Sequence, residues 1–297
     1  MTDQTARQDP RDQYPGPEVQ PAESIDYPGQ TQDMTPEPDH GEKSYRGAGR
    51  LEGKRAIVTG GDSGIGRAVA LAFAREGADV LVTHLPEETD DAAQTARLVE
   101  EAGRRVVVVE GDLREEDHCK AVVARAVSEL GGVDILVNNA AYQMAQPDGL
   151  LGITTEQLDR VYRTNIYAMF WLCQAAVPHM QAGATIVNTT SIQAFDPSPP
   201  LLDYASTKAA ILNFTRGLSQ QLADRGIRVN AVAPGPIWTP LIPATMPEGK
   251  TEQFGADTPM GRAGQPAELA PAYVYLASQE SSYVSGEYIA VTGGKLT

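Results

Sequence analysis

The stretch IVTGGDSGIGRAVALAFAREGADV, residues 57–80, decides the fold of this chain. It opens as a short β-branched run, passes through a glycine-rich turn and continues as a helix-like segment. Gly60, Gly64 and Gly66 permit a tight turn and a close backbone approach to a ligand. The helix that follows offers free N–H groups and the positive end of its dipole, which suit a pyrophosphate. Because the glycines stand between a clear strand and an amphipathic helix, the stretch predicts dinucleotide binding.

The same alternation of strand and helix patterns continues to the end of the chain. Short apolar runs occupy 55–59, 79–83, 105–110, 133–138, 184–190, 227–233 and 287–291, and helix-like stretches lie between them at 64–76, 88–102, 115–130, 155–181, 203–225 and 266–278. The runs are continuously apolar, as expected for strands covered on both faces. The sequence therefore predicts one α/β, Rossmann-type doubly wound domain over residues 51–297. Its seven-stranded sheet is mostly parallel, with helices on both faces.

Composition excludes several classes of protein. The 297 residues carry a formal net charge of −15 and show no basic stripe, which argues against a nucleic-acid partner. No apolar run is long enough to span a bilayer, and the N-terminus has no apolar signal core. The two cysteines are far apart, and the four histidines form no i, i+4 pair, so we expect neither a disulfide framework nor a metal. A reduced, cytoplasmic protein is the expectation.

Residues 1–50 differ from the rest. They hold seven prolines, ten acidic and five basic residues, and only isolated apolar side chains. Such a segment cannot bury enough apolar area to offset its ordering entropy, so it is not expected to fold alone. Two arrangements stay open. The extension is either flexible, or an arm that wraps over its own domain or a neighbouring subunit, with Tyr14, Tyr27 and Tyr45 as anchors.

A second informative stretch is NTTSIQAFDPSPPLLDYASTKAA, residues 188–210. Ser191 ends an apolar run, at the rim where open α/β sheets bind ligands, and Lys208 follows Tyr204 by one helical turn. Y-x-x-x-K arises by chance in many helices, so its weight comes from the glycine loop upstream. Tyrosine titrates near pH 10, too high for an efficient base, and a neighbouring ammonium lowers the pKa of the phenol. The three residues predict a proton-transfer site.

Taken in order, the motifs resemble one family. TGGDSGIG (59–66), NNAA (138–141), RTNIYAMF (163–170), YASTK (204–208) and PGPIWT (234–239) are similar to those of short-chain dehydrogenases/reductases, over nearly all of 51–297. More narrowly, the acidic, proline-rich lead before GRLEGKRAIVTGG resembles the bacterial general-stress, glucose/ribitol-dehydrogenase-like subgroup.

This resemblance implies an NAD(P)-dependent oxidoreductase. It would transfer hydride between nicotinamide and a small alcohol, polyol or carbonyl compound, with a homotetramer as the expected assembly. Tyr204 is implied as general acid/base, Ser191 as the donor to the substrate oxygen, and Lys208 as the partner of the nicotinamide ribose. Asn165 is implied to hold a water that links Lys208 to solvent.

The resemblance also implies a set of cofactor-binding positions. Asp112 would meet the adenine amino group, although an N-cap of the next helix is a second interpretation. Glycine is usual in the family where Ala141 stands, and aspartate where Thr292 stands. The implied set is Gly60, Asp62, Ser63, Gly64, Ile65, Gly66, His84, Asp112, Leu113, Asn139, Ala140, Ala141, Thr189, Tyr204, Lys208, Pro234, Gly235, Ile237 and Thr239.

The choice between NAD and NADP is read at the end of the second strand, where an acid usually bonds the ribose 2′-hydroxyl of NAD. His84 occupies that place. It either donates a hydrogen bond to the cofactor or is a solvent-exposed loop residue. Glu87 and Glu88 follow closely and would repel a 2′-phosphate, so the expectation is NAD(P) with a slight lean to NAD.

Three segments are candidates for the substrate end: 141–146, 193–202 and the long loop 236–265, which is placed as a lid. For Trp238 and Phe254, lid packing and substrate contact are both open. Tyr142 and Gln193 are either substrate ligands or surface residues. Enoyl reduction is disfavoured, because those relatives have a wider Tyr–Lys spacing. The non-enzymatic alternative is a dinucleotide-sensing, stress-associated binding protein.

Overall fold

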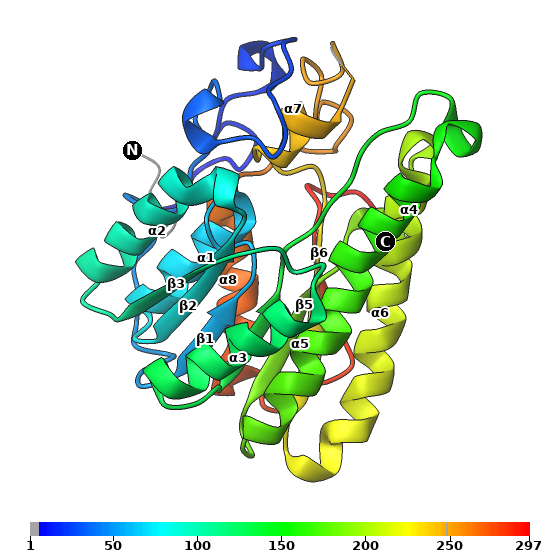
Figure 1. The fold of residues 1–297 in the computed structure, drawn as a ribbon. Coiled ribbons are helices and arrows are strands. Elements are labelled where there is room, and N and C mark those ends of the chain that lie inside the picture. Colours follow the sequence, from blue (N-terminus) through cyan, green and yellow to red (C-terminus); the bar gives the residue numbers. More distant parts are fainter. Residues whose placement is uncertain (1–5, 248) are drawn as a thin grey trace.

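Seven strands form one sheet in the computed structural model, which describes residues 6–247 and 249–297 (Figure 1). Their order is β3-β2-β1-β4-β5-β6-β7, and every neighbouring pair is parallel. The prediction of a doubly wound sheet is therefore confirmed. The strands are β1 (Arg55–Val58), β2 (Asp79–His84), β3 (Val106–Glu110), β4 (Ile135–Asn138), β5 (Thr185–Thr189), β6 (Arg228–Pro234) and β7 (Tyr288–Val291).

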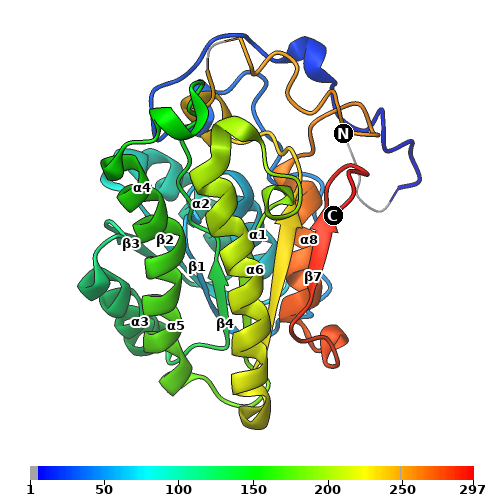
Figure 2. The same ribbon diagram turned by 90° about the vertical axis from the view of Figure 1, so that its right-hand side faces the viewer.

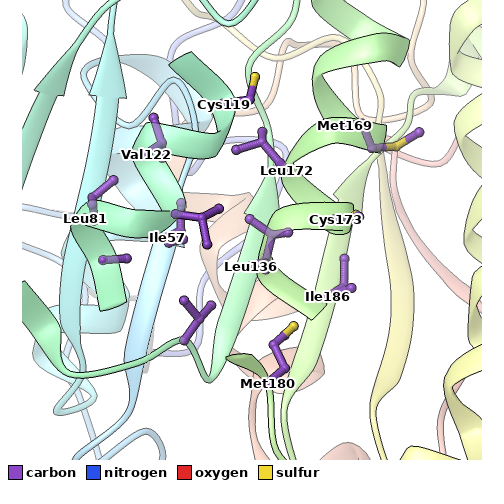
Figure 3. Packing of buried hydrophobic residues seen from close by; sticks show 14 of the residues in the cluster. Ile57, Leu81, Cys119, Val122, Leu136, Met169, Leu172, Cys173, Met180 and Ile186 are labelled. Carbon is purple, nitrogen blue, oxygen red and sulfur yellow. The ribbon is translucent and has the colours of Figure 1, made fainter. Parts of the chain in front are cut away.

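Helices cover both faces of the sheet (Figures 1 and 2). One face carries α1 (Gly64–Arg75), α2 (Thr89–Glu101) and α8 (Pro266–Ala277), and the other carries α3 (Glu116–Leu130), α5 (Ala168–Ala176) and α6 (Leu202–Leu222). Successive strand side chains point to opposite faces. Ile57 and Leu81 thus pack under α3 and α5 (Figure 3), whereas Val58 and Val82 pack under α1 and α8. Two apolar cores explain why the strands read as unbroken apolar runs.

The predicted helix over 155–181 is interrupted. It consists of α4 (Thr155–Tyr162), a π-helical turn (Arg163–Tyr167), α5 and a final 3₁₀ turn (Val177–His179). The side chain of Asn165 supplies the reason. Its Oδ1 accepts from the Tyr142 backbone N–H at 2.8 Å, and its Nδ2 donates to the Tyr142 carbonyl at 2.9 Å. The wider turn aims this amide out of the helix, toward the chain that follows β4.

Asp112 is not the N-cap of the next helix. α3 begins at Glu116, with Glu115 at the cap position. The Asp112 carboxylate instead accepts from the Arg114 backbone N–H at 2.9 Å, and the Glu115 N–H donates to the Asp112 carbonyl at 3.2 Å. A separate turn therefore stands between β3 and α3, which leaves Asp112 at the edge of the sheet.

Residues 6–39 lie across the carboxyl edge of the sheet, beside the 236–265 loop and α7 (Leu241–Thr245) (Figures 1 and 2). Residues 41–50 continue to the C-terminal end of α1, where Arg75 donates to the Tyr45 carbonyl at 2.6 Å. The indole N–H of Trp238 donates to the Pro36 carbonyl at 2.8 Å, and the Thr251 hydroxyl donates to the Pro21 carbonyl at 2.6 Å. Trp238 is buried against Met34 and Ala263, so it packs the lid. We refer to residues 6–50 as the arm.

The thiols, possible metal sites and possible membrane spans were the remaining features to compare with the sequence. Cys119 and Cys173 are buried, free thiols. In residues 6–247 and 249–297, no group of histidine, cysteine, aspartate and glutamate side chains is arranged to hold a metal ion. None of the helices in those two ranges has the length and apolar character that crossing a membrane requires.

Candidate active site

A cavity of about 800 Å³ opens at the carboxyl ends of the strands, across the point between β1 and β4 where the strand order reverses. This is where open α/β sheets bind ligands. Among the predicted site residues, only Gly66 and Asn165 stand outside its lining. The predicted residues in the lining are Gly60, Asp62, Ser63, Gly64, Ile65, His84, Asp112, Leu113, Asn139, Ala140, Ala141, Thr189, Ser191, Tyr204, Lys208, Pro234, Gly235, Ile237 and Thr239.

The glycine loop has the geometry that a pyrophosphate needs. Gly60 has a φ of +59°, and a Cβ added to Gly66 would lie 1.8 Å from the Gly60 carbonyl oxygen. Glycine is therefore required at both positions. Thr59 Oγ1 accepts from the Asn139 N–H at 2.9 Å, which fixes the loop to the end of β4. The first N–H groups of α1 have no intrahelical acceptor and face the cavity end of the helix. These residues fit a dinucleotide.

Ser191, Tyr204 and Lys208 meet in one buried corner of the cavity. The Lys208 Nζ lies 5.2 Å from the centre of the Tyr204 ring and donates to the Thr189 carbonyl at 2.9 Å. Ser191 Oγ accepts from the Gln193 N–H at 3.2 Å and faces the same cavity as the tyrosine. The segment just after β5 supplies the serine, and one face of α6 supplies the tyrosine and the lysine. The side chains of Tyr204 and Lys208 thus converge as the i, i+4 spacing predicts.

Burial dominates the protonation of this trio. It raises the pKa of Tyr204 to about 12, against a smaller lowering by the hydrogen bond to Ser191. The same burial lowers the pKa of Lys208 to about 7. Both shifts favour the neutral form of the side chain. In the protein alone, the phenol pKa is therefore shifted opposite to the direction predicted from the neighbouring ammonium.

Asn165 lies one layer behind the cavity. Both of its amide N–H groups are used, one by the Tyr142 carbonyl and one by Thr207 Oγ1 at 3.0 Å. Thr207 lies on α6 between Tyr204 and Lys208, and its hydroxyl donates to the Tyr204 carbonyl at 2.7 Å. Asn165 therefore ties the chain after β4 to the helix that carries the tyrosine and the lysine.

At the other end of the cavity, the ends of β2 and β3 meet. His84 is buried, with 5% of its surface exposed, and its Nδ1 lies 2.8 Å from the Leu85 carbonyl oxygen. The interpretation of His84 as a solvent-exposed loop residue was wrong, because it is the last residue of β2. Glu88 Oε2 accepts from the Leu85 N–H at 2.9 Å. Burial first, and then the charge of Asp62, raise the pKa of Glu88.

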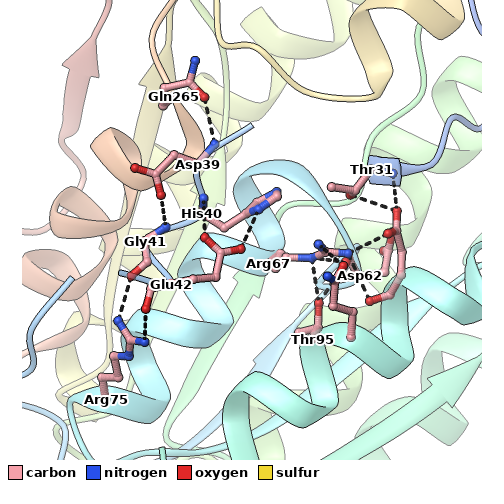
Figure 4. A network of polar contacts seen from close by, with 12 residues as sticks. Thr31, Asp39, His40, Gly41, Glu42, Asp62, Arg67, Arg75, Thr95 and Gln265 are labelled. Atoms are coloured by element: carbon pink, nitrogen blue, oxygen red, sulfur yellow. Dashed lines mark hydrogen bonds and ion pairs between the residues drawn. The ribbon is translucent and has the colours of Figure 1, made fainter. Parts of the chain in front are cut away.

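Asp62 follows the second glycine of the loop and is also buried. Burial raises the pKa of its carboxyl group. Asp62 lines the cavity, and its buried Oδ2 atom has no hydrogen-bond partner among the described residues. The Asp62 carbonyl accepts from Arg67 Nε at 2.8 Å (Figure 4), which holds the loop against α1. A buried polar atom without a partner fits a ligand hydroxyl at this place.

The substrate end is lined by polar side chains, among them Gln143, Gln193 and Ser198. Gln193 Nε2 donates to Ser198 Oγ at 2.8 Å, and Gln143 Nε2 donates to Thr245 Oγ1 at 2.9 Å. Phe254 lines the cavity and also packs near Trp238, whereas Tyr142 is buried and packs against Tyr27. Ala141 and Thr292 are the two positions where this chain differs from the residue usual in the family. Ala141 lines the cavity, and Thr292 Oγ1 donates to the Lys295 carbonyl at 2.8 Å.

Sequence reasoning missed several lining residues. Tyr27 and Pro28 come from the arm, Arg160 from α4, and Arg114 from the turn before α3. Lys295 comes from the C-terminal segment, whereas Lys250 and Asp257 lie in the loop 236–265, which was expected as a lid without these two residues being singled out. Their positions depend on long-range packing, so no local spacing marks them. The aromatic character of Tyr27 in a polar segment was the one usable signal.

Comparisons with known proteins agree with this geometry. A family model described as enoyl-(acyl carrier protein) reductase matches residues 60–295. The chain is 54% identical to the oxidoreductase YghA of Escherichia coli (strain K12), over 97% of each chain. It is 48% identical to the glucose and ribitol dehydrogenase of Daucus carota, covering 95% of this chain and 98% of the relative.

Among solved structures, a short-chain dehydrogenase from Burkholderia cenocepacia J2315 in complex with NADP matches with a TM-score of 0.77. It is 33% identical, and the match covers 82% of this chain and 98% of that chain. The glycine loop, the Ser191–Tyr204–Lys208 corner and these likenesses agree: the chain belongs to the short-chain dehydrogenase/reductase family and is an NAD(P)-dependent oxidoreductase.

Proposed function

We propose that the protein transfers hydride between NAD and a small polyhydroxylated alcohol, or the corresponding carbonyl compound, with Tyr204 moving the proton. The observation that carries this proposal is the buried corner of Ser191, Tyr204 and Lys208, which shares one cavity with the glycine loop. When bound, the nicotinamide gives or takes the hydride at its C4 atom. The side chains bind the substrate oxygen and move the proton.

For the oxidation of an alcohol, Ser191 donates a hydrogen bond to the substrate oxygen and stabilises the negative charge that develops there. Tyr204 Oη accepts the hydroxyl proton, which requires a phenolate. Because burial raises the pKa of Tyr204 to about 12, positive charge beside the ring has to lower it again. Protonated Lys208 and the positive ring of the oxidised cofactor are the two sources. We assign Asn165 as a positioning residue for α6, since both of its amide donors are engaged.

The polyol class is supported by the lining of the substrate end. Gln143, Gln193 and Ser198 offer hydrogen-bond donors and acceptors that match a chain of hydroxyl groups. The name of the carrot relative, glucose and ribitol dehydrogenase, supports the same class. Enoyl reduction, which the description of the matched family names, is the second candidate. The four-residue spacing of Tyr204 and Lys208, with Ser191 upstream, argues against it.

A spectrophotometric assay at 340 nm tests the proposal, with pentitols, hexitols, aldoses, simple ketones and an enoyl thioester in separate reactions. We expect turnover with polyols or aldoses and none with the thioester. Turnover with the thioester alone would favour enoyl reduction. No turnover on any compound, with dinucleotide binding intact, would favour the dinucleotide-sensing alternative.

We further propose a preference for NAD over NADP. Glu88 and Asp62 both line the cavity near the end of β2, where the 2′-group of the adenosine ribose is read. A carboxylate accepts a hydrogen bond from a 2′-hydroxyl and repels a 2′-phosphate. Since burial and the charge of Asp62 raise the pKa of Glu88, its charge grows as the pH rises through that raised value. The preference for NAD should therefore increase with pH.

The ratio of kcat/KM for the two cofactors, measured between pH 6 and pH 9, tests this preference. Glu88→Gln should lower the NAD/NADP ratio by about tenfold, corresponding to roughly 1.4 kcal/mol, and flatten its pH dependence. Glu100→Gln is the control, because Glu100 is exposed on α2 and does not line the cavity. A ratio that favours NADP in the unaltered protein would contradict the proposal.

A homotetramer in the cytoplasm remains part of this proposal. Leu158, Tyr167 and Phe170, on and between α4 and α5, are 43%, 45% and 42% exposed, and such apolar side chains support a contact with another copy. Free Cys119 and Cys173 support a reducing compartment. Light scattering tests the assembly, and a monomer would contradict it.

A further inference from the structure

The arm passes directly over the end of the cavity that holds the ends of β2 and β3. Tyr27 and Pro28 line the cavity together with His84, Asp112 and Leu113. The residues on either side are fixed to the domain. The Ile25 N–H donates to the Pro243 carbonyl at 3.2 Å, and Gln30 Nε2 donates to the Glu87 carbonyl at 3.1 Å. The arm is thus anchored both to the lid and to the turn after β2.

We propose that Tyr27 and Pro28 form the outer wall of the adenosine half of the dinucleotide site, so that the arm is a cofactor-binding element of the enzyme. The inference rests on dinucleotide binding in this cavity, as proposed above. It adds a wall that the sheet itself does not supply, contributed by residues outside the Rossmann-type domain.

Arg160 holds Tyr27 in place. Its guanidinium group lies 4.7 Å from the centre of the Tyr27 ring and 4.1 Å from the centre of the Tyr142 ring. The two rings meet edge to face, with their centres 5.2 Å apart. A cation against two aromatic faces is a favourable arrangement. Since Arg160 also lines the cavity, the arm and α4 contribute to one surface there, and Arg160 links both to Tyr142 in the chain after β4.

The contact with Tyr142 connects the two ends of the site. The Tyr142 backbone is held by the Asn165 amide at 2.8 and 2.9 Å, and Asn165 is bonded to Thr207 on α6. A displacement of Tyr27 would therefore disturb a set of contacts that leads to the helix carrying Tyr204.

A second set of contacts ties the arm to the glycine loop (Figure 4). Thr31 donates twice to Asp91 Oδ2, from its backbone N–H at 2.8 Å and from its hydroxyl at 3.0 Å. Asp91 Oδ1 pairs with Arg67 Nη2 at 2.7 Å, and Arg67 Nε donates to the Asp62 carbonyl at 2.8 Å. Arg67 is fully buried, so breaking this ion pair would leave a buried charge without a partner and would destabilise the fold. The position of the arm and the shape of the loop are thereby coupled.

The chemistry of this end suits an adenosine. Leu113 and the Tyr27–Pro28 segment offer apolar and aromatic surface for a flat base, and Asp112 offers an acceptor for an exocyclic amino group. The cations Arg114 and Arg160 stand beside the same surface. The arm shields a base that packs there from water. Without the arm, the edge of the sheet would leave that base exposed.

The test compares two tyrosines of the arm. Tyr27→Ala removes the proposed wall. Tyr14→Ala is the matched control, because Tyr14 also lies against an arginine, with Arg262 at 5.2 Å from its ring centre, and does not line the cavity. Dissociation constants are measured for NADH and for ADP-ribose, which lacks the nicotinamide. Thermal unfolding of each variant checks that the fold is retained.

We expect Tyr27→Ala to raise both dissociation constants by about tenfold, a typical loss for removing an aromatic partner of a base. Tyr14→Ala should leave both constants within about twofold. Constants unchanged by Tyr27→Ala, or raised equally by both substitutions, would overturn the inference.

Hydrogen exchange of the unaltered protein provides a second measurement, which needs no variant to fold. ADP-ribose should slow exchange at residues 25–31 and leave residues 9–14 unchanged, because binding and arm order are coupled reciprocally. If ADP-ribose binds but exchange at residues 25–31 is the same with and without it, the inference about the arm is overturned and the proposed function still stands. Failure of the unaltered protein to bind any dinucleotide would instead contradict the proposed function on which the inference rests.

Discussion

The two ends of the cavity are built in different ways. At the nicotinamide end, Ser191, Tyr204 and Lys208 lie within 18 positions of one another and come from the segment just after β5 and from α6. At the adenosine end, Tyr27 meets Arg160 and Tyr142, which are more than 100 positions away in the chain. The first end depends on local spacing and the second on tertiary contacts. The comparison separates the residues that carry the chemistry from those that hold the cofactor.

The largest effect is expected at the nicotinamide end. Tyr204→Phe removes the group that moves the proton, so kcat should fall by roughly a thousandfold, within the range for loss of a general acid–base group. The dissociation constant of NADH should remain within about twofold, because the ring still fills its place. Steady-state kinetics and a binding titration check this. Retained turnover would contradict the assignment of proton transfer to Tyr204 at the nicotinamide end.

A second substitution tests the effect of burial at the same end. Burial lowers the pKa of Lys208 from 10.5 to about 7 in the folded chain. Between these two pH values the unfolded chain binds the additional proton, so the free energy of unfolding should rise with pH across this window. Lys208→Met should remove that rise, and should also weaken cofactor binding and turnover.

Urea unfolding at several pH values between 7 and 10.5 measures the difference. Lys43→Met is the control, because Lys43 is an exposed lysine of the arm. Parallel pH curves for the unaltered protein and Lys208→Met would show that the lysine is not held in a desolvated site.

The smallest effect is expected where the arm is anchored. Thr31→Val removes the hydroxyl bond to Asp91 at 3.0 Å but keeps the backbone bond at 2.8 Å. Loss of one buried hydrogen bond of this kind costs about 1–2 kcal/mol. Residues near 31 should exchange faster and be cleaved sooner by protease, with kcat unchanged. Thr35→Val, at an exposed position, is the control. A large loss of kcat would mean that the two ends are more tightly coupled than the contacts suggest.

The sequence was informative wherever an interaction is local. The glycine spacing predicted the loop, and the apolar runs predicted all seven strands to within two residues at each end. It was misleading where a side chain bonded a partner that periodicity does not reveal. The helix over 155–181 was interrupted because Asn165 bonds Tyr142, and Asp112 closed a turn with Arg114 instead of capping α3. Periodicity carries no information about such partners.

By itself, the sequence determined the sheet, the glycine loop and the pairing of Tyr204 with Lys208, because each follows from steric limits and helical or strand periodicity over a few residues. The tertiary structure decided two other matters. It placed the arm over the cavity, through Arg160 and Asp91, and it set the pKa of Tyr204 and Lys208 through burial. Burial and long-range contacts depend on how the whole chain packs, so no short stretch of sequence contains them.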